Sequence, residues 1–445
     1  MDRSRERVAA RADRRGAFPG QRNADRRTLR CHARGERHRP CPSKRAHHRR
    51  GARGHGRADR DRQDASRADR EVIDRYRDDL IRLSREINAD PELAYEEHRA
   101  VARIVALLEK HGHPVERNLA GLPTAFRARV GPAGPAVALL AEYDALPEVG
   151  HGCGHNLISM TIVGAFLLAA AKARDLQVGI ELVGTPAEEK GGGKIDLLEK
   201  GVFKQSVAAL FSHPGAGGKW SVSERLLGIT VKRVIYEGLA SHAAVSPEKG
   251  RNALTALIAL FVAVDGWRQH LPSTARVHGI IREGGVASNI IPSRAVGDFG
   301  IRAAEMDRLK EMVGTFTDMA NGAARQTNTK LTIEDEMRPY LPVVANPKLG
   351  DALAVELERQ GKTPLRDHLV TASGDIGNVS QEVPTDYIGF PVSADEIPGH
   401  SHRMREASVS DYAHDSAFVV IDALAATALR VAIDKAFRES LRTSA

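Results

Sequence analysis

The segment between Asp144 and His155 carries the side chains of this sequence that are best suited to metal chemistry. Cys153 and His155 form a Cys-x-His pair, which places a thiolate and an imidazole side by side. First-row divalent metals bind such donors readily. Glycines alternate with these residues and let the backbone turn tightly enough for the donors to converge. The spacing therefore predicts a metal-binding loop.

The adjacent acids Glu188 and Glu189 form a second candidate feature, because they follow an apolar run and Pro186. Neighbouring carboxylates at the end of a strand can point to different sides. One of them can then bind a metal while the other takes a proton from water, as metal-assisted hydrolysis requires. The alternative is a pair of solvated surface acids. The Cys-x-His loop upstream favours the catalytic interpretation.

Other positions carry side chains of the same kinds. Asp144 precedes Leu-Pro in the predicted loop, which suits a carboxylate that orients a metal ligand, although a turn residue is the alternative. His213 follows an apolar run, and taken alone it could equally be a structural histidine. His400 and His402 share one polar loop, and their residue types do not separate a ligand from a solvated side chain.

The signatures of several other enzyme classes are missing. The run of three glycines before Lys194 is not a P-loop, because the upstream glycine and the following Ser or Thr are absent. Neither Gly-x-Ser-x-Gly nor His-Glu-x-x-His occurs in the sequence, which argues against a serine hydrolase and against a zincin.

The order of the predicted elements places the candidate residues at one edge of a sheet. Apolar strands at 124–130, 136–143, 178–184 and 207–211 follow two helices at 72–89 and 96–111, and helices at 157–171 and 195–200 lie between the strands. This alternation predicts an α/β fold with a mainly parallel sheet. Asp144, the acid pair and His213 are each expected just past a strand end, where the active sites of such sheets collect.

A second folding unit is predicted within the first. Strands at 226–236, 275–281, 294–301 and 330–333 and helices at 253–264 and 306–320 follow one another in the order βαββαβ. That order describes a split βαβ unit. We therefore expect a catalytic domain in two parts, 69–222 and 337–445, interrupted by a smaller domain at 223–336. The second part should contain a helix at 347–360, a strand at 386–390 and a long helix from 409 to about 437.

Charge is distributed unevenly along the 445 residues. The first 70 residues contain 23 Lys and Arg against 9 Asp and Glu, a net +14, so the total of +8 leaves −6 for the remaining 375. Residues 1–68 lack apolar periodicity and are expected to be a disordered Arg-rich tail. The alternatives for this tail are a nucleic-acid or anionic-surface arm, a solvated extension and an over-extended reading frame. We expect no nucleic-acid partner, because no aromatic residues are interleaved with the charges.

Cysteine use and hydropathy bear on the cellular setting. Two of the three cysteines lie in the tail, which leaves Cys153 alone in the folded part and excludes a disulfide framework there. This suits a reducing, cytoplasmic location. The apolar run at 157–171 is too short to cross a bilayer, and the N-terminus carries no hydrophobic secretory segment. No membrane partner is therefore expected.

Seven motifs together resemble the M20 metallopeptidase/amidohydrolase family, and within it the aminoacylase-like branch that includes aminobenzoyl-glutamate hydrolases. The resemblance extends from about residue 71 to 437. The motifs are Ala-Glu-Tyr-Asp-Ala-Leu-Pro at 141–147, Gly-Cys-Gly-His-Asn at 152–156, Gly-Thr-Pro-Ala-Glu-Glu at 184–189, Ser-His-Pro at 212–214, Ala-Ser-His-Ala-Ala at 240–244, Gly-Gly at 284–285 with Asn-Ile-Ile-Pro at 289–292, and Gly-His-Ser at 399–401.

The resemblance assigns roles to the candidate side chains. It makes Glu188 the general base. Asp144, which its place in the loop suits to orienting a ligand, is expected to support catalysis. It favours His400 over His402, because Gly-His-Ser with Ala407 seven residues later matches the family spacing. The implied metal ligands are Cys153, His155, Glu189, His213 and His400.

The same resemblance implies a metal-dependent exopeptidase-type catalytic domain with an inserted ferredoxin-like lid that also dimerises. One or two divalent ions, Mn²⁺ or Zn²⁺, are expected. His242 on the lid is expected to reach the active site of the partner subunit in a homodimer or higher homo-oligomer and to help stabilise the oxyanion. Asn289 and Arg302 are expected to hold the substrate, with Arg302 as a clamp for its carboxylate.

Three functions compete at this stage. The first is hydrolysis of the amide of an N-acyl, aminoacyl or aroyl amino acid, a small molecule that bears a carboxylate, by direct attack of water with Glu188 as proton carrier. The second uses the same site to remove the amino group of a carboxylated aromatic amine. The third is a non-catalytic binding protein on a hydrolase fold.

Overall fold

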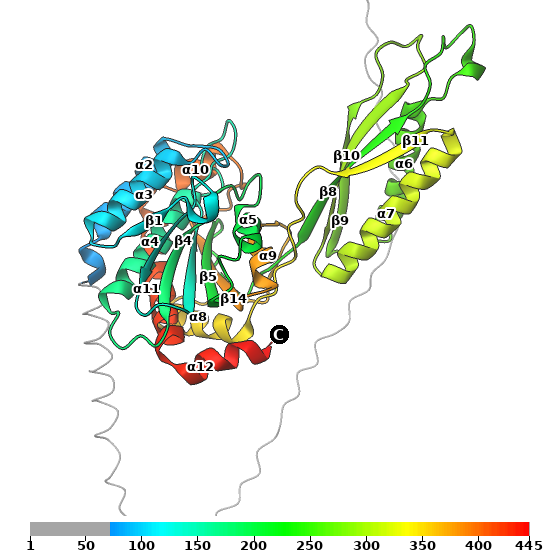
Figure 1. Ribbon diagram of the computed structural model, residues 1–445. Helices are drawn as coiled ribbons and strands as arrows, with labels where there is room; N and C mark the ends of the chain where they lie inside the picture. The colour runs from blue at the N-terminus through cyan, green and yellow to red at the C-terminus, as the bar shows by residue number, and fades with distance from the viewer. Residues whose placement is uncertain (1–71, 445) are drawn as a thin grey trace, which may run out of the picture. The chain divides into compact units, whose positions relative to one another are not determined.

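The computed structural model describes residues 72–444, so the predicted tail at 1–68 lies outside the described residues. The larger sheet has eight strands, in the order β1-β2-β4-β3-β5-β14-β6-β12 (Figure 1). These strands are β1 (Val115–Arg117), β2 (Phe126–Val130), β3 (Ala136–Ala141), β4 (Gly179–Gly184), β5 (Ser206–Gly215), β6 (Ser221–Val222), β12 (Leu365–Arg366) and β14 (Thr385–Pro391).

The centre of this sheet is parallel, as the alternation of helices and strands predicts. β3 pairs in parallel with β4 and with β5, and β5 pairs in parallel with β14. Every residue of β3 and of β4 is buried, which explains why both read as continuous apolar runs. The pairs β1–β2, β2–β4 and β14–β6 are antiparallel and the edge pair β6–β12 is parallel, so the whole sheet is mixed.

Helices cover this sheet. α4 is buried along almost its whole length, packs against α2 and α11, and contacts β3, β4 and β5. The helices of this part are α2 (Arg77–Ala89), α3 (His98–Lys110), α4 (His155–Ala171), α5 (Gly193–Glu199), α8 (Pro347–Arg359), α9 (Ile376–Ser380), α10 (His402–Ala407), α11 (Asp411–Ile433) and α12 (Lys435–Ser440).

The predicted long helix from 409 to 437 is wrong as a single element, because it is divided into α11 and α12. Asp434 between them adopts extended backbone angles, and its side chain accepts a hydrogen bond from the backbone N–H of Phe437. It therefore caps the start of α12. α11 is long and apolar enough to cross a membrane by composition, but 72% of its apolar window is buried inside the protein.

The second sheet confirms the predicted βαββαβ order. Its four strands lie in the order β11-β8-β10-β9, all pairs are antiparallel, and α6 and α7 pack on it and on each other. It has a hydrophobic core of its own, built around Tyr236, Phe299 and Phe316. The elements are β8 (Gly228–Glu237), α6 (Ala253–Arg268), β9 (Ala275–Glu283), β10 (Arg294–Ala303), α7 (Met306–Thr327) and β11 (Lys330–Asp335).

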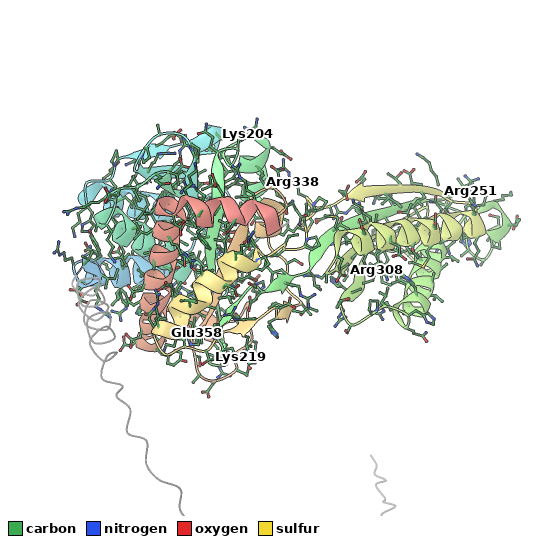
Figure 2. The ribbon with its side chains drawn as sticks, turned by 90° about the horizontal axis from the view of Figure 1, so that it is seen from below. Lys204, Lys219, Arg251, Arg308, Arg338 and Glu358 are labelled. Carbon is green, nitrogen blue, oxygen red and sulfur yellow. The ribbon has the colours of Figure 1, made fainter. Side chains whose placement is uncertain are left out.

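Charged side chains cover the outside of both parts. Figure 2 shows Lys204, Lys219, Arg338 and Glu358 around the first sheet, and Arg251 and Arg308 around the second. A short two-stranded sheet of β7 (Arg225–Leu226) and β13 (Leu369–Val370) completes the strands of the described residues.

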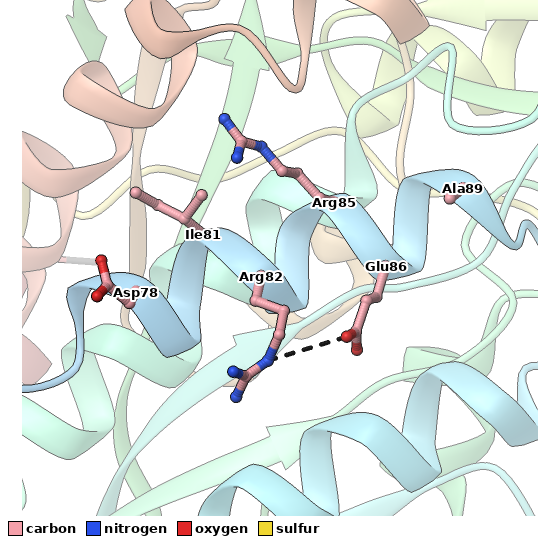
Figure 3. Close-up of a pocket in the computed structure, with 6 residues that line it drawn as sticks. All are labelled: Asp78, Ile81, Arg82, Arg85, Glu86 and Ala89. Carbon is pink, nitrogen blue, oxygen red and sulfur yellow. Dashed lines mark ion pairs between the residues drawn. The ribbon is translucent and has the colours of Figure 1, made fainter.

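The amphipathic pattern predicted for α2 is confirmed by its two faces. Leu80, Leu83 and Ile87 are buried in the core. The opposite face lines an open hollow on the surface, where Arg82 and Glu86 form an ion pair at 3.9 Å (Figure 3). None of the predicted site residues lines this hollow. The residues that line it are Asp78, Ile81, Arg82, Arg85, Glu86 and Ala89.

One placement predicted from the sequence is wrong. His213 does not follow a strand but lies within β5, paired with Gly389 of β14. The reason is that β5 pairs with β3 only as far as Leu210, whereas its pairing with β14 continues to Gly215. At Pro214, β5 no longer pairs with β3. A proline, which has no N–H to donate, can therefore be accommodated in this strand.

Candidate metal centre

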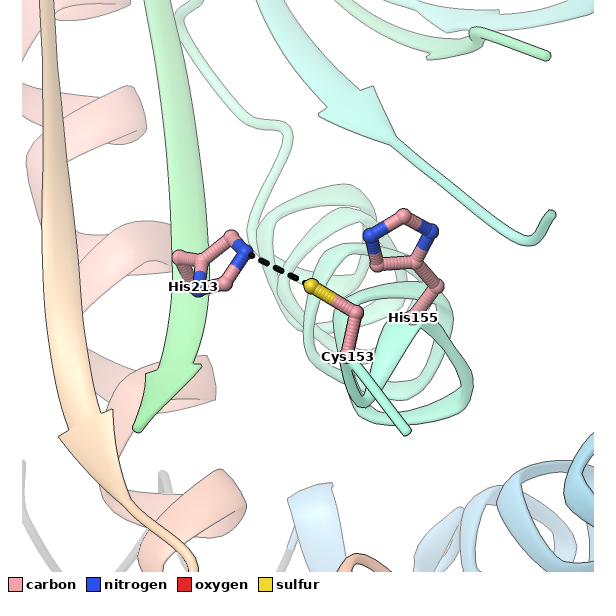
Figure 4. Close-up of side chains that lie close together, drawn as sticks. All are labelled: Cys153, His155 and His213. Carbon is pink, nitrogen blue, oxygen red and sulfur yellow. Dashed lines mark hydrogen bonds between the residues drawn. The ribbon is translucent and has the colours of Figure 1, made fainter. Parts of the chain in front are cut away.

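The loop between β3 and α4 brings two predicted ligands together. Figure 4 shows Cys153, His155 and His213 around one point, with the Cys153 Sγ 3.6 Å from the His213 Nε2. The Nδ1 of His213 lies 2.8 Å from the carbonyl oxygen of Pro214, which turns its Nε2 toward the thiol. Cys153, His155 and His213 thus offer three ligand atoms within 4.8 Å of one another.

Asp144 holds the side chain of His155 and the backbone of Glu189 from behind the cluster. Its Oδ1 lies 2.9 Å from the Nδ1 of His155, and its Oδ2 accepts a hydrogen bond from the backbone N–H of Glu189 at 2.9 Å. Asp144 and His155 are each 1% exposed. The contact fixes the imidazole so that its Nε2 faces the cluster, the usual arrangement for a histidine that binds a metal.

The acid pair lies on a backbone bend in which Ala187 adopts a φ of +59°. This left-handed conformation costs free energy for a residue with a side chain, and the surroundings hold it in place. The buried Glu97 carboxylate accepts a hydrogen bond from the N–H of Ala187 at 2.8 Å. The hydroxyl of Tyr340 donates to the carbonyl of Glu188 at 2.6 Å. Glu97 and Tyr340 were not singled out from the sequence.

The structure separates the two histidines that the residue types left open. His400 Nε2 lies 3.7 Å from Glu189 Oε1, and its backbone N–H donates to the carbonyl of Gly152 in the metal loop. Cys153, Glu189 and His400 form a second group of ligand atoms within 4.8 Å of one another. Both histidines are exposed, but His402 begins α10 and belongs to neither ligand group. The five predicted ligands are therefore distributed over two groups that share Cys153.

Several buried polar atoms of this cluster lack a well-formed hydrogen bond among the described residues, and a bound cation would satisfy them. His155 Nε2, Glu189 Oε1 and Glu142 Oε2 are buried without a well-formed hydrogen bond among the described residues. Such atoms are costly unless a metal or an ion satisfies them. His155 Nε2 lies 3.4 Å from Glu142 Oε2 and 3.9 Å from an oxygen of each of Glu188 and Glu189. The donor set thus fits a divalent cation.

The electrostatics of the cluster agree with this fit. Burial and the neighbouring carboxylates, first Glu142, raise the pKa of Glu188 well above its ordinary value. Burial raises the pKa of the Cys153 thiol to about 12, whereas a bound cation would stabilise its thiolate. Burial lowers the pKa of His213 to about 4, which keeps the imidazole neutral and able to bind a metal.

A buried ionic network supports the acid pair, and no sequence pattern predicted it. The Lys194 ammonium donates to Glu142 Oε1 at 2.5 Å and to Asp375 Oδ1 at 2.6 Å, and none of the three side chains is more than 2% exposed. Lys194 and Asp375 are 181 residues apart. Gly374 leaves room for Glu188, because a Cβ at Gly374 would lie 2.8 Å from Glu188 Oε1. A local motif cannot reveal such a distant pairing.

The predicted lid residues differ in how far they reach toward this cluster. Arg302 on β10 donates from Nη1 to Ser373 Oγ at 3.0 Å, beside Gly374. His242 and Asn289 are exposed, and their hydrogen bonds among residues 72–444 stay within the second folding unit, where the N–H of Ala243 donates to the carbonyl of Asn289 in a neighbouring loop. Roles for these three side chains remain predictions.

The fold and the donor set together define an α/β metallohydrolase, and comparisons with known proteins agree. The profile of peptidase family M20/M25/M40 matches residues 138–420. The Xaa-Arg dipeptidase of Mus musculus is 38% identical, with 84% of this chain and 90% of the relative covered. One of the subunits of the p-aminobenzoyl-glutamate hydrolase of Escherichia coli strain K12 is 28% identical, with 82% of this chain and 93% of the relative covered.

The fold comparison points the same way. A dinuclear metal binding peptidase of the M20 family from Bacillus subtilis superposes with a TM-score of 0.64 at 18% identity, over 81% of this chain and 99% of that one. The chain therefore belongs to peptidase family M20/M25/M40. It is a metal-dependent hydrolase that acts on carbon–nitrogen bonds. The family predicted from the motifs is confirmed.

The Lys194 network generates a stability prediction. Lys194→Met should lower the free energy of unfolding by about 3–5 kcal/mol, because it leaves the buried carboxylates of Glu142 and Asp375 without their cation. Urea unfolding of the metal-free protein measures this. Lys200→Met, an exposed lysine at the end of the same helix, is the matched control. Equal unfolding midpoints for the two variants would contradict the assigned role of Lys194.

Proposed function

We propose that this enzyme hydrolyses the amide bond of a small N-acyl, aminoacyl or aroyl amino acid and releases the amino acid. The observation that carries the proposal is the pair of ligand groups sharing Cys153, next to a third group in which Glu188 joins Glu142 and His155. The relatives support it, because one is named a dipeptidase and another a hydrolase of p-aminobenzoyl-glutamate. Both names describe compounds in which an amide joins an amino acid to its acyl group.

The proposed ligands are Cys153, His155, Glu189, His213 and His400, for one or two Mn²⁺ or Zn²⁺ ions. When bound, such an ion lowers the pKa of water and polarises the amide carbonyl. The Glu188 carboxylate takes the proton from the attacking water and returns it to the departing amine. Its raised pKa suits this task, since a stronger base accepts the proton more readily. The reaction needs no covalent enzyme intermediate.

The role of Glu188 can be separated from ligation. Glu188→Gln should lower kcat by at least about 1,000-fold, because the amide cannot carry the proton, while the metal content stays unchanged. Product analysis by mass spectrometry, together with elemental analysis of the purified variant, measures both quantities. Glu189→Gln is the matched variant and should lose metal. Loss of metal in Glu188→Gln would make Glu188 a ligand instead.

We also propose that the enzyme is a homodimer in which His242 acts on the partner's substrate. The backbone N–H groups of Ala244 and Val245 donate to His242 Nδ1, at 3.2 and 3.3 Å, which leaves Nε2–H as the free donor. That is the form needed to stabilise an oxyanion. Apolar side chains near His242 are exposed in the single chain, with Val245 77% and Val286 90% exposed. Contact with a second subunit would cover them.

Mixing two inactive variants tests action between subunits. Dimers with one Glu188→Gln chain and one His242→Ala chain contain one site with both native residues. Random reassociation should therefore restore about a quarter of wild-type activity. Activity is measured after the subunits have been separated and reassociated, with mass photometry to confirm mixed dimers. Dimers that form but show no recovery would place His242 in its own subunit's site or outside catalysis.

A further inference from the structure

A cavity of about 280 Å³ adjoins the metal cluster. At one end it is lined by Glu188, the proposed base, and by His213, a proposed ligand. It continues between the turn after β6 and the strand β14, where Glu224 and Tyr387 line it. A group of the substrate next to the scissile amide can therefore extend into it. Its lining shows which kind of group fits.

The distant part of the cavity combines an acid with a buried hydroxyl. Tyr387 is 1% exposed, and its hydroxyl interacts with the Glu224 carboxylate, although the two do not form a well-aligned hydrogen bond. Glu224 Oε1 accepts a hydrogen bond from Ser221 Oγ at 2.5 Å. Gly389 makes room for this acid, because a Cβ there would lie 3.0 Å from Glu224 Oε1. A carboxylate and a buried hydroxyl in one cavity favour a ligand that carries hydrogen-bond donors.

Apart from Glu188 at the metal cluster, Glu224 is the lining carboxylate that no protein cation pairs with among residues 72–444. Glu142 is neutralised by Lys194, and Lys219 pairs with Glu396 at 2.8 Å. His368 is a further lining group able to carry charge. Glu224 forms no ion pair with any residue in the range 72–444. A cationic group in the cavity would therefore find one carboxylate that no protein cation neutralises.

The walls between the two ends are apolar. Leu226, Val370 and Ile376 line the cavity together with Phe211 and Phe390. Methylene groups would be buried favourably against these side chains. An aliphatic stem with a charged end matches this lining, which is apolar between the metal cluster and the carboxylate of Glu224.

The contact between Arg302 and Ser373 indicates which part of the substrate enters. Ser373 lines the cavity and accepts a hydrogen bond from Arg302, the predicted clamp for the substrate carboxylate. A carboxylate held by Arg302 beside Ser373 would leave the side chain of the same amino acid at the mouth of the cavity. That amino acid is the one released when the amide is cleaved.

We propose that this cavity receives the side chain of the departing amino acid, and that Glu224 selects a cationic side chain such as that of lysine, ornithine or arginine. This inference rests on the amide hydrolysis proposed above and names its substrate class. An anionic side chain, as in a glutamate conjugate, would meet Glu224 as a like charge and is disfavoured.

The first experiment compares kcat/KM for dipeptides with a constant first residue and a second residue of Arg, Lys, Gln or Glu. Wild type should prefer Arg and Lys. Glu224→Gln should lower kcat/KM for the Arg and Lys dipeptides by about 10- to 100-fold, because it removes a hydrogen bond between charged groups. The value for the Gln dipeptide should change little. Glu224→Lys should shift the preference toward Glu. Glu109→Gln, an exposed acid on α3, is the matched control and should leave all four values unchanged.

A binding experiment separates failure of this inference from failure of the proposed function. Isothermal titration of free L-arginine and L-glutamine into the metal-loaded full chain reports on the cavity without turnover. Arginine should bind wild type at least about 10-fold more tightly than it binds Glu224→Gln. If no amide is cleaved but this difference is found, the proposed reaction is wrong and the cavity assignment holds. Equal affinity in both proteins, or equal kcat/KM for all four dipeptides, would overturn the inference.

Discussion

The carboxylate of Asp144 is the contact on which the rest of the centre depends. One oxygen faces His155 Nδ1 and the other accepts the N–H of Glu189, each at 2.9 Å. It thereby joins the loop after β3 to the loop after β4, which adjacent parallel strands bring to the same edge of the sheet. Burial alone would raise the pKa of Asp144, but His155 and the Glu189 N–H lower it, so the group stays charged. A charged and fully engaged Asp144 fixes the positions of two proposed ligands at once.

Crowded carboxylates explain why the centre needs positive charge on two sides. Glu142, Glu188 and Glu189 approach one another around His155 Nε2. On one side Lys194 donates two short hydrogen bonds to Glu142 and Asp375 and offsets part of their negative charge. On the other side the ligand groups that share Cys153 provide a place for a divalent cation. Removing either positive charge would leave buried anions uncompensated, which is the most costly situation in a protein interior.

Local sequence patterns predicted much of this arrangement. Continuous apolar runs located β3, β4 and α4, and the order of further apolar runs located the βαββαβ unit, because burial determines both the pattern and the fold. Glycine spacing and the Cys-x-His pair located the metal loop. The break at Asp434 was missed because the apolar pattern continues across it. His213 was placed beyond its strand because the sequence does not show that β14 extends the pairing of β5.

Contacts between distant segments could not be predicted in the same way. Lys194 meets Asp375 across 181 residues, and Glu97 supports Ala187 across 90. The cavity with Glu224 and Tyr387 forms only when β14 pairs with β5 and β6. These features carry the electrostatics and the proposed specificity of the site. Family motifs therefore indicated the reaction class, whereas the substrate class had to be inferred from the three-dimensional structure.

The central claim is that Cys153 and the surrounding imidazoles and carboxylates bind a catalytic metal. X-ray absorption spectroscopy of the Zn²⁺-loaded protein tests it most directly. The account predicts a sulfur ligand at about 2.3 Å together with nitrogen and oxygen ligands at about 2.0–2.2 Å. The sulfur contribution should disappear in Cys153→Ser. A wild-type spectrum that contains only nitrogen and oxygen neighbours would contradict the claim and place the metal elsewhere.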